Sequence, residues 1–117
     1  NAIEPGSYLP PHRHLDPNKD ETMVVVRGRL GVVFFDDQGQ VWQTAVLAAA
    51  GTVCGVNIPY GLYHTVLALH PRTVMLEAKA GPYLPLLENE RATWAPGEGE
   101  PAAAAYAQSL RERFAEA

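Results

Sequence analysis

The sequence predicts an all-β domain with one helix at its C-terminal end, and three observations carry this prediction. Ten glycines and ten prolines are spread along the chain, where they separate short apolar runs. These runs recur about every 10 residues, which is the spacing of strands in a sandwich or a barrel. The alanine-rich segment over residues 101–117 is instead typical of a helix.

Six segments rich in β-branched and aromatic residues have the length and composition of strands. Gly28 is expected to turn the chain after the first of them, and Asp36–Gly39 to form a hairpin turn between the second and the third. Cys54 lies in the fourth segment, so we expect its thiol to be buried. The predicted strands are residues 21–27, 30–36, 40–47, 52–58, 63–69 and 72–80.

The rest of the chain divides into two parts. Residues 81–100 show little periodicity and are expected to wrap irregularly around the β domain, which makes residues 1–100 one unit. In the helix expected over residues 101–117, Tyr106, Leu110 and Phe114 follow the spacing of one helix face. That face would pack either on the β domain or on a second subunit.

Composition narrows the classes of function. The 117 residues are 47% hydrophobic and 19% charged, as in one globular domain. A net charge of −4 without a basic cluster argues against a nucleic-acid partner. The single cysteine excludes an internal disulfide and a cysteine-based zinc cluster. No apolar run approaches the roughly 20 residues of a membrane span, so we expect a cytoplasmic protein without a membrane partner.

Three histidines and one glutamate form the group of residues that carries chemistry. His12 and His14 are separated by one residue, so in an extended segment both imidazoles point to the same side. Glu21 opens the first predicted strand, and His64 follows a break at Pro59. Three neutral imidazoles and one carboxylate are a natural donor set for a divalent transition metal. Spacing alone does not close this site, because the fold must bring His64 to the others.

These residues resemble the two conserved motifs of the cupins. Gly6, His12, His14, Glu21 and Gly28 stand where the first motif has its conserved positions, and residues 59–64 resemble the second. The resemblance implies a small antiparallel jelly-roll barrel, or double-stranded β-helix. It also implies one divalent metal ion, of iron, manganese, nickel or zinc, held by His12, His14, Glu21 and His64.

The spacer between His14 and Glu21 departs from that family's pattern, since it has six residues where cupins usually have three or four. The extra residues would either bulge outward or bring Asp16 or Asp20 into competition with Glu21.

Further residues are similar to the WbuC-type cupin-fold metalloproteins, notably residues 4–8, 36–39, 77–83 and 94–96. Members of that group are found with O-antigen and other surface-polysaccharide gene clusters. The likeness implies a small-molecule ligand such as a sugar or a nucleotide-sugar. Because cupins commonly pair through exposed strands, it also implies a homodimer, with the helix face as one candidate contact.

Other candidates follow from strand parity. Met23 shares a face with Glu21, and Glu77 shares one with Lys79, which either points inward to a substrate or points outward as a solvated pair. Arg27 has the same parity as Glu21 and would meet an anionic substrate at one end of the barrel. We therefore expect substrate contacts from Arg27, Lys79 and Met23.

Glu77 is also a candidate catalytic group. Tyr60 and Tyr63 flank the second motif and would either line the mouth of the pocket, as catalytic candidates, or pack at its rim. His70 precedes a proline in an apparent turn and is expected to be a plain surface residue.

Three classes of function remain open. The leading one is a metal-dependent enzyme acting on a small molecule, of the isomerase, epimerase or oxygenase type. The second is a non-catalytic binding module whose metal organises the pocket. The third is a structural barrel without a metal.

Overall fold

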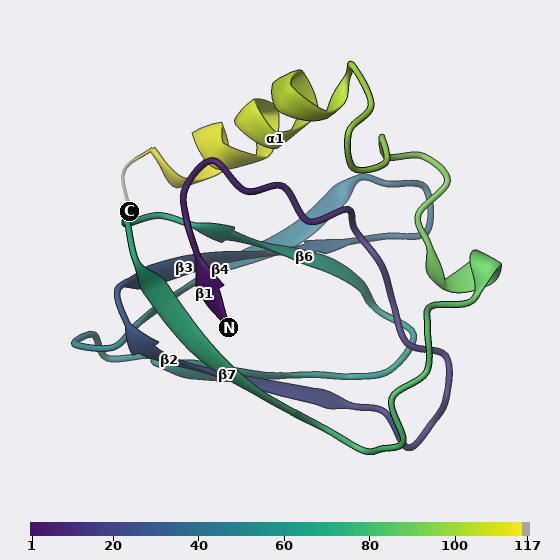
Figure 1. Cartoon of the computed structure of the whole chain (residues 1–117), viewed down its shortest axis with the longest axis horizontal. Coiled ribbons are helices and arrows are strands. Elements are labelled where there is room, and N and C mark those ends of the chain that lie inside the picture. Colours follow the sequence, from purple (N-terminus) through teal and green to yellow (C-terminus); the bar gives the residue numbers. More distant parts are fainter. Residues whose placement is uncertain (116–117) are drawn as a thin grey trace.

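Two antiparallel sheets pack face to face in the computed structural model, which describes residues 1–115 of the chain (Figure 1). One sheet has the strand order β1-β7-β2-β5 and the other the order β4-β3-β6. The strands are β1 (Ala2–Ile3), β2 (Glu21–Arg27), β3 (Arg29–Phe35), β4 (Val41–Ala48), β5 (Gly55–Ile58), β6 (Tyr63–Ala68) and β7 (Thr73–Lys79). This arrangement confirms the predicted all-β jelly roll.

The predicted strands match the observed ones closely, with one informative exception. Strand β2 has the predicted bounds, whereas β5 begins only at Gly55. Cys54 therefore lies just outside the strand, and its side chain is exposed, so the expectation of a buried thiol is wrong. Only its backbone takes part in the sheet, because the Cys54 carbonyl accepts a hydrogen bond from the Val25 amide at 2.8 Å. An apolar segment at a sheet end does not by itself bury its side chains.

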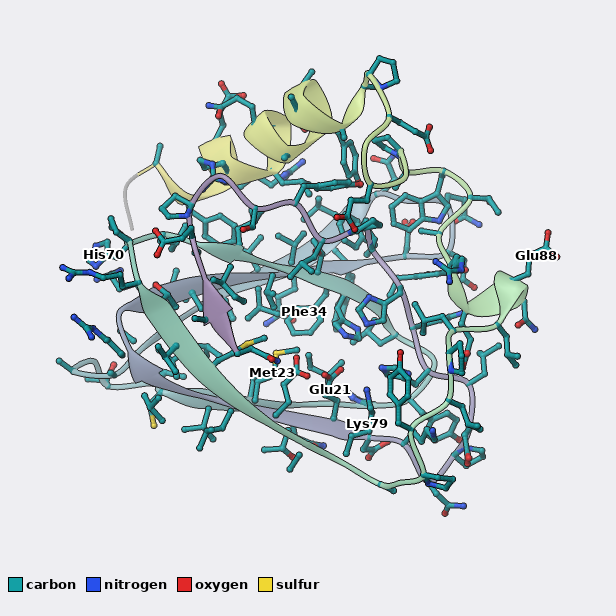
Figure 2. The ribbon with its side chains drawn as sticks, viewed as in Figure 1. Glu21, Met23, Phe34, His70, Lys79 and Glu88 are labelled. Atoms are coloured by element: carbon teal, nitrogen blue, oxygen red, sulfur yellow. The ribbon has the colours of Figure 1, made fainter. Side chains whose placement is uncertain are left out.

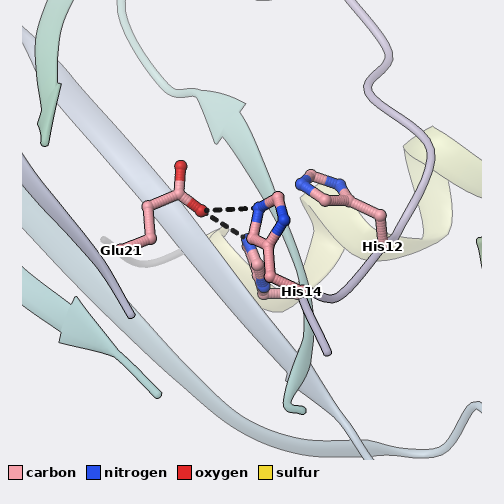
Figure 3. A group of neighbouring side chains, drawn as sticks. His12, His14 and Glu21 are labelled. Carbon is pink, nitrogen blue, oxygen red and sulfur yellow. Dashed lines mark hydrogen bonds and ion pairs between the residues drawn. The ribbon is translucent and has the colours of Figure 1, made fainter. Parts of the chain in front are cut away.

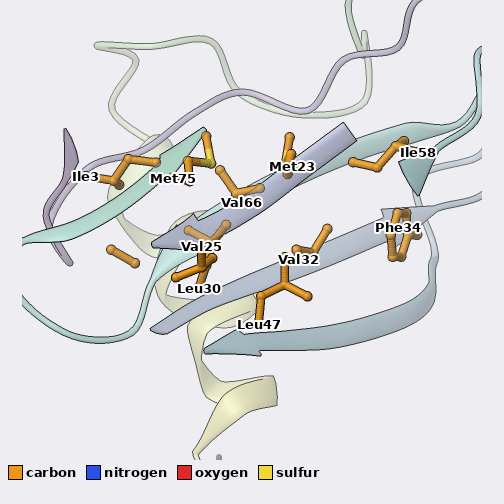
Figure 4. Packing of buried hydrophobic residues seen from close by; sticks show 11 residues of the cluster. Ile3, Met23, Val25, Leu30, Val32, Phe34, Leu47, Ile58, Val66 and Met75 are labelled. Carbon is orange, nitrogen blue, oxygen red and sulfur yellow. The ribbon is translucent and has the colours of Figure 1, made fainter. Parts of the chain in front are cut away.

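The core between the two sheets is apolar and follows strand alternation. Met23 and Val25 of β2 point inward, as do Leu30, Val32 and Phe34 of β3 (Figure 4). This packing holds β2 against the facing sheet, and Glu21 shares the inward face. The other buried members of this cluster are Ile3, Leu47, Ile58, Val66, Ala68 and Met75.

A second core lies on the outer face of the three-stranded sheet, under the C-terminal helix (Figure 1). Helix α1 (Ala103–Arg111) and the 3₁₀ turn η2 (Glu112–Phe114) place Leu110 and Phe114 against the alternate residues of β3 and β6. Gly31 makes this contact close, because a Cβ there would lie 2.8 Å from the Phe114 ring. Leu110 and Phe114 are thus buried against their own barrel and are not free for a subunit contact. The homodimer stays a prediction.

The helix is shorter than the range 101–117 expected from composition, and residues 116–117 lie outside the described part of the chain. Residues 81–100 form the expected irregular wrap, interrupted by the 3₁₀ turn η1 (Glu88–Glu90). No described helix has the length and apolarity needed to cross a membrane.

The turn between β2 and β3 carries the chain from one sheet to the other. Gly28 has a φ of +82°, in the left-handed region, and a Cβ there would lie 2.5 Å from Thr73 Oγ1. Only glycine fits both conditions without strain. The turn thereby fixes the end of β2 opposite the one that carries Glu21.

Candidate metal centre

Backbone hydrogen bonds bring the two sequence motifs together. The amide of His12 donates to the carbonyl of His64 at 3.1 Å, and the amide of His64 donates back to the carbonyl of His12 at 2.9 Å. The amide of Gly61 donates to the carbonyl of His14 at 2.6 Å. The segment with the first two histidines therefore lies directly beside the start of β6, which carries the third.

The four predicted ligands converge at one point. One donor atom from each of His12, His14, Glu21 and His64 lies within 4.8 Å of the others. Glu21 Oε1 is 3.1 Å from His64 Nε2 and 3.6 Å from His14 Nε2 (Figure 3). Glu21 is 2% exposed and His64 1% exposed, so the group is held inside the barrel.

Two imidazole rings are oriented by their second nitrogen. His64 Nδ1 lies 2.9 Å from the Leu62 carbonyl oxygen, and His12 Nδ1 lies 3.3 Å from the Pro10 carbonyl oxygen. A carbonyl oxygen can only accept, so each Nδ1 carries the proton and donates it. The lone pair is then on Nε2, as in histidines that bind a metal and donate their other N–H to the backbone.

The electrostatics favour a cation at this point. Burial and the neighbouring His64 lower the pKa of His12 to about 4, so its imidazole is neutral at pH 7. Burial and the Lys79 ammonium also lower the pKa of His14. Burial alone would raise the pKa of Glu21, but the contact with His64 and nearby positive charge outweigh it and lower the pKa to about 2.

The buried Glu21 carboxylate thus faces the imidazoles of His14 and His64, and no described Lys or Arg nitrogen lies within 4.0 Å of it. A buried charge requires compensation, which a divalent cation supplies. The donor set therefore fits a divalent transition metal.

A cavity of about 420 Å³ is lined by three of the four donor residues, His12, Glu21 and His64. Its wall is apolar on one side, where Met23, Val66 and Met75 contribute. Glu77 and Lys79 of β7 add polar groups. The cavity therefore combines apolar walls with a few polar groups, as small-molecule sites do.

Strand register explains where the polar groups of β7 lie. Lys79 stands directly across from Glu21 on the neighbouring strand, and Glu77 stands across from Met23. Lys79 Nζ is 3.5 Å from His14 Nε2. Burial and the charge of Glu21 raise the pKa of Glu77. Glu77, Lys79 and Met23 thus lie with the four ligands, in the region that strand parity predicted.

The structure does not bring Tyr60, Tyr63 or Arg27 to this cavity. Tyr63 is buried on the opposite side of β6, where it packs against Trp94 and the Arg13 guanidinium lies 4.5 Å from its ring centroid. Tyr60 is half-exposed beside Trp42 in an open surface depression. Arg27 follows an irregularity in the pairing of β2 with β7 and is exposed.

The long spacer between His14 and Glu21 turns outward. The Asp16 carboxylate accepts a hydrogen bond from the Asn18 amide at 2.9 Å. The Asp20 carboxylate accepts one from the Tyr60 amide, also at 2.9 Å. Both aspartates thereby stabilise the backbone of the spacer and neighbouring turn, and Glu21 remains the carboxylate of the cluster.

Glu90 supports the site and was not foreseen from the sequence. Its carboxylate is 8% exposed and accepts hydrogen bonds from the Leu15 and Leu87 amides, each at 2.9 Å. Its carbonyl accepts a third from the Arg13 amide at 2.9 Å. Glu90 therefore attaches the wrap to both sides of His14. It stands among other glutamates in an aperiodic segment, and no sequence signal separates it from them.

A larger cavity of about 620 Å³ lies between residues 9–12 and the wrap. It shares Leu9 and His12 with the metal-site cavity but does not include Glu21 or His64. The cavity of 420 Å³ is therefore the one that combines the ligand residues with Glu77 and Lys79.

Comparisons with known proteins agree with this fold. Residues 1–47 match a family described as a domain of unknown function, DUF6016, which is less than half of the chain. No curated protein matches the sequence. A serine-to-alanine mutant of Bacillus subtilis oxalate decarboxylase OxdC has a similar structure, with a TM-score of 0.52 at 16% identity. The match covers 98% of this chain and 29% of the decarboxylase chain. The chain therefore shares the jelly-roll fold of that structure, and it carries a His/Glu cluster able to hold a metal.

Proposed function

We propose that this protein is a metal-dependent enzyme acting on a small molecule, such as a sugar or nucleotide-sugar of surface-polysaccharide biosynthesis. The observation that carries the proposal is the convergence of four donor atoms within 4.8 Å of one another, from four residues of which three line a cavity. The substrate class comes from the likeness to WbuC-type proteins described above.

The donor set leaves room for a ligand. Three imidazole nitrogens and one carboxylate oxygen leave up to two positions on a six-coordinate ion. A bound iron, manganese, nickel or zinc ion would supply Lewis-acid chemistry or activation of water or dioxygen. The protein's own contribution is to hold the ligands in place, exclude water with Met23 and Met75, and orient polar groups of the ligand with Glu77 and Lys79.

A non-catalytic binding module is the second candidate. One observation favours it, since Tyr60 and Tyr63 lie away from the cavity and leave Glu77 as the one predicted catalytic candidate within it. The two functions differ in the fate of the ligand. An enzyme converts it, whereas a binding module shows saturable binding and releases the ligand unchanged.

Metal content measured by inductively coupled plasma mass spectrometry tests the proposal. We expect about one equivalent of a transition metal in the untagged protein and none in the His12→Ala, His64→Ala double variant. His70→Ala is the matched control, because His70 is an exposed histidine remote from the cluster (Figure 2). A parent protein without metal after reconstitution, or a double variant that retains it, would contradict the proposal.

A further inference from the structure

Lys79 is the one lysine that lines the cavity, and it has no ion-pair partner among the described residues. Lys79 and Glu21 are opposite each other on β7 and β2, and both point into the space between the sheets (Figure 2). Nevertheless, no carboxylate oxygen of the described residues lies within 4.0 Å of its ammonium group. Its side-chain hydrogen-bond contact among the described residues is with His14 Nε2, at 3.5 Å.

Glu21 cannot readily serve as the partner of this lysine, because its carboxylate oxygen Oε1 already faces His64 and His14 at 3.1 and 3.6 Å. Glu77 stands two residues before Lys79 on the same strand face, but it also forms no ion pair with it. The lysine charge is therefore left for a molecule that enters the cavity.

The charge balance of the cavity gives the sign of that molecule. A divalent ion on the donor set carries two positive charges, of which Glu21 balances one. Lys79 adds another positive charge and Glu77 offsets at most one, so the loaded cavity keeps a net positive charge. The walls formed by Ile3, Met23 and Met75 are apolar, and charges interact more strongly beside such walls than in water. A loaded cavity would therefore attract an anion.

We propose that Lys79 binds the carboxylate of a small acidic ligand that carries an oxygen on the adjacent carbon. This inference rests on the proposed function: Lys79 Nζ lies 3.5 Å from His14 Nε2, so an oxygen beside the bound carboxylate would be within reach of a metal held by the four donors. For a sugar, this chemistry is that of a uronic acid. Lys79 acts here as a point charge on a flexible stem, which suits a carboxylate approaching from the cavity.

Calorimetric titration of the zinc-loaded protein with glucuronate and with glucose tests this inference. We expect glucuronate to bind tighter than glucose, and Lys79→Met to weaken glucuronate binding roughly tenfold to a hundredfold, as loss of a charge-assisted hydrogen bond does. Lys79→Arg should retain most of the affinity. Lys19→Met is the matched control, because this second lysine donates to the Pro82 carbonyl at the surface.

Zinc content of each variant, measured in parallel, separates the two proposals. Lys79 is exposed to the cavity mouth and is not one of the four ligands, so we expect about one equivalent of zinc in Lys79→Met. If zinc binds but Lys79→Met leaves glucuronate affinity unchanged, or glucose binds as tightly as glucuronate, the inference is wrong and the metal site stands. If the parent binds no zinc, both proposals fail together.

Discussion

The two sheets of the barrel differ in what covers their outer faces. Every residue of β6 is buried, because the inner face meets the other sheet and the outer face meets α1 or the wrap. In β2, burial alternates over the first residues, and Val24 and Val26 lie exposed on the outer face. Strand β6, enclosed on both faces, supplies His64, and the sheet covered on one side supplies Glu21, Glu77 and Lys79.

The residues of the site therefore come from strands that differ in how they are covered. His64 comes from a strand covered on both faces, whereas Glu21, Glu77 and Lys79 come from strands with one free face. Measurements on matched variants from the two regions test whether the two sheets differ in this way in solution.

The largest expected effect compares one leucine from each sheet. Leu67 of β6 is fully buried, and Leu76 of β7 is 60% exposed on the outer face. We expect Leu67→Ala to lower the free energy of unfolding by about 2–5 kcal/mol, because it leaves a cavity under the helix. Leu76→Ala should change it by less than about 0.5 kcal/mol. Urea unfolding measures both, and equal losses would show that the outer face of β7 is covered in solution.

Two glycines test the cover that α1 and η2 provide. A Cβ at Gly31 would lie 2.8 Å from the Phe114 ring, whereas one at Gly6 meets nothing within 4 Å. Gly31→Ala should therefore lower the free energy of unfolding by about 1–3 kcal/mol through overpacking. Gly6→Ala should leave it unchanged or slightly raised. If thermal unfolding shows the two variants to be alike, Phe114 does not pack on β3 in solution.

A third comparison concerns how the C-terminal helix and the irregular wrap are attached to the barrel. The helix is attached by apolar side chains, whereas the wrap is attached in part by the Glu90 carboxylate. Glu90→Ala leaves two partly buried amides without a partner, which costs toward the lower end of about 1–3 kcal/mol. Glu88→Ala is the control, since its side chain is exposed. The same two variants, titrated with zinc, should show weaker metal binding only for Glu90→Ala.

The smallest expected effect is a pH dependence of the metal-free protein. Burial opposes ionisation of Glu90, but the amide hydrogen bonds from Leu87 and Leu15 outweigh it and lower its pKa below 4.5. The unfolded chain then binds a proton first as pH falls, so stability is full above about pH 4.5 and declines through the folded pKa. Chemical unfolding at about pH 7 and pH 3.5 should show a smaller decline for Glu90→Gln. An identical decline would mean that this carboxylate does not titrate as described.

Much of this fold was predictable because its signals are local. The valines and Gly28 predict the bounds of strand β2. Strand alternation predicts that Met23 and Glu21 point to the same side. The same parity separates Tyr63 from His64, since adjacent strand residues point to opposite faces. Tyr63 accordingly lies outside the cavity, and applying parity to it would have removed it as a catalytic candidate.

The remaining features depend on contacts between distant segments. The pairing of β1 with β7, the exposure of Cys54 and the hydrogen bonds of Glu90 have no periodic signature. The cluster itself was predictable only through its resemblance to a motif, because spacing alone does not bring His64 to Glu21. Strand parity does not tell which end of a strand reaches the cavity. Lys79, at the end of β7, lines the cavity, whereas Arg27, at the end of β2, does not.

The paired backbone hydrogen bonds between His12 and His64 close a long loop that contains β2, β3, β4 and β5. A metal held by both side chains would close the same loop a second time. An unfolded chain offers no such meeting point, so binding free energy would add directly to folding free energy. Metal occupancy would then report how completely the loop has closed, and a chelator would lower the melting temperature without altering any residue of the core.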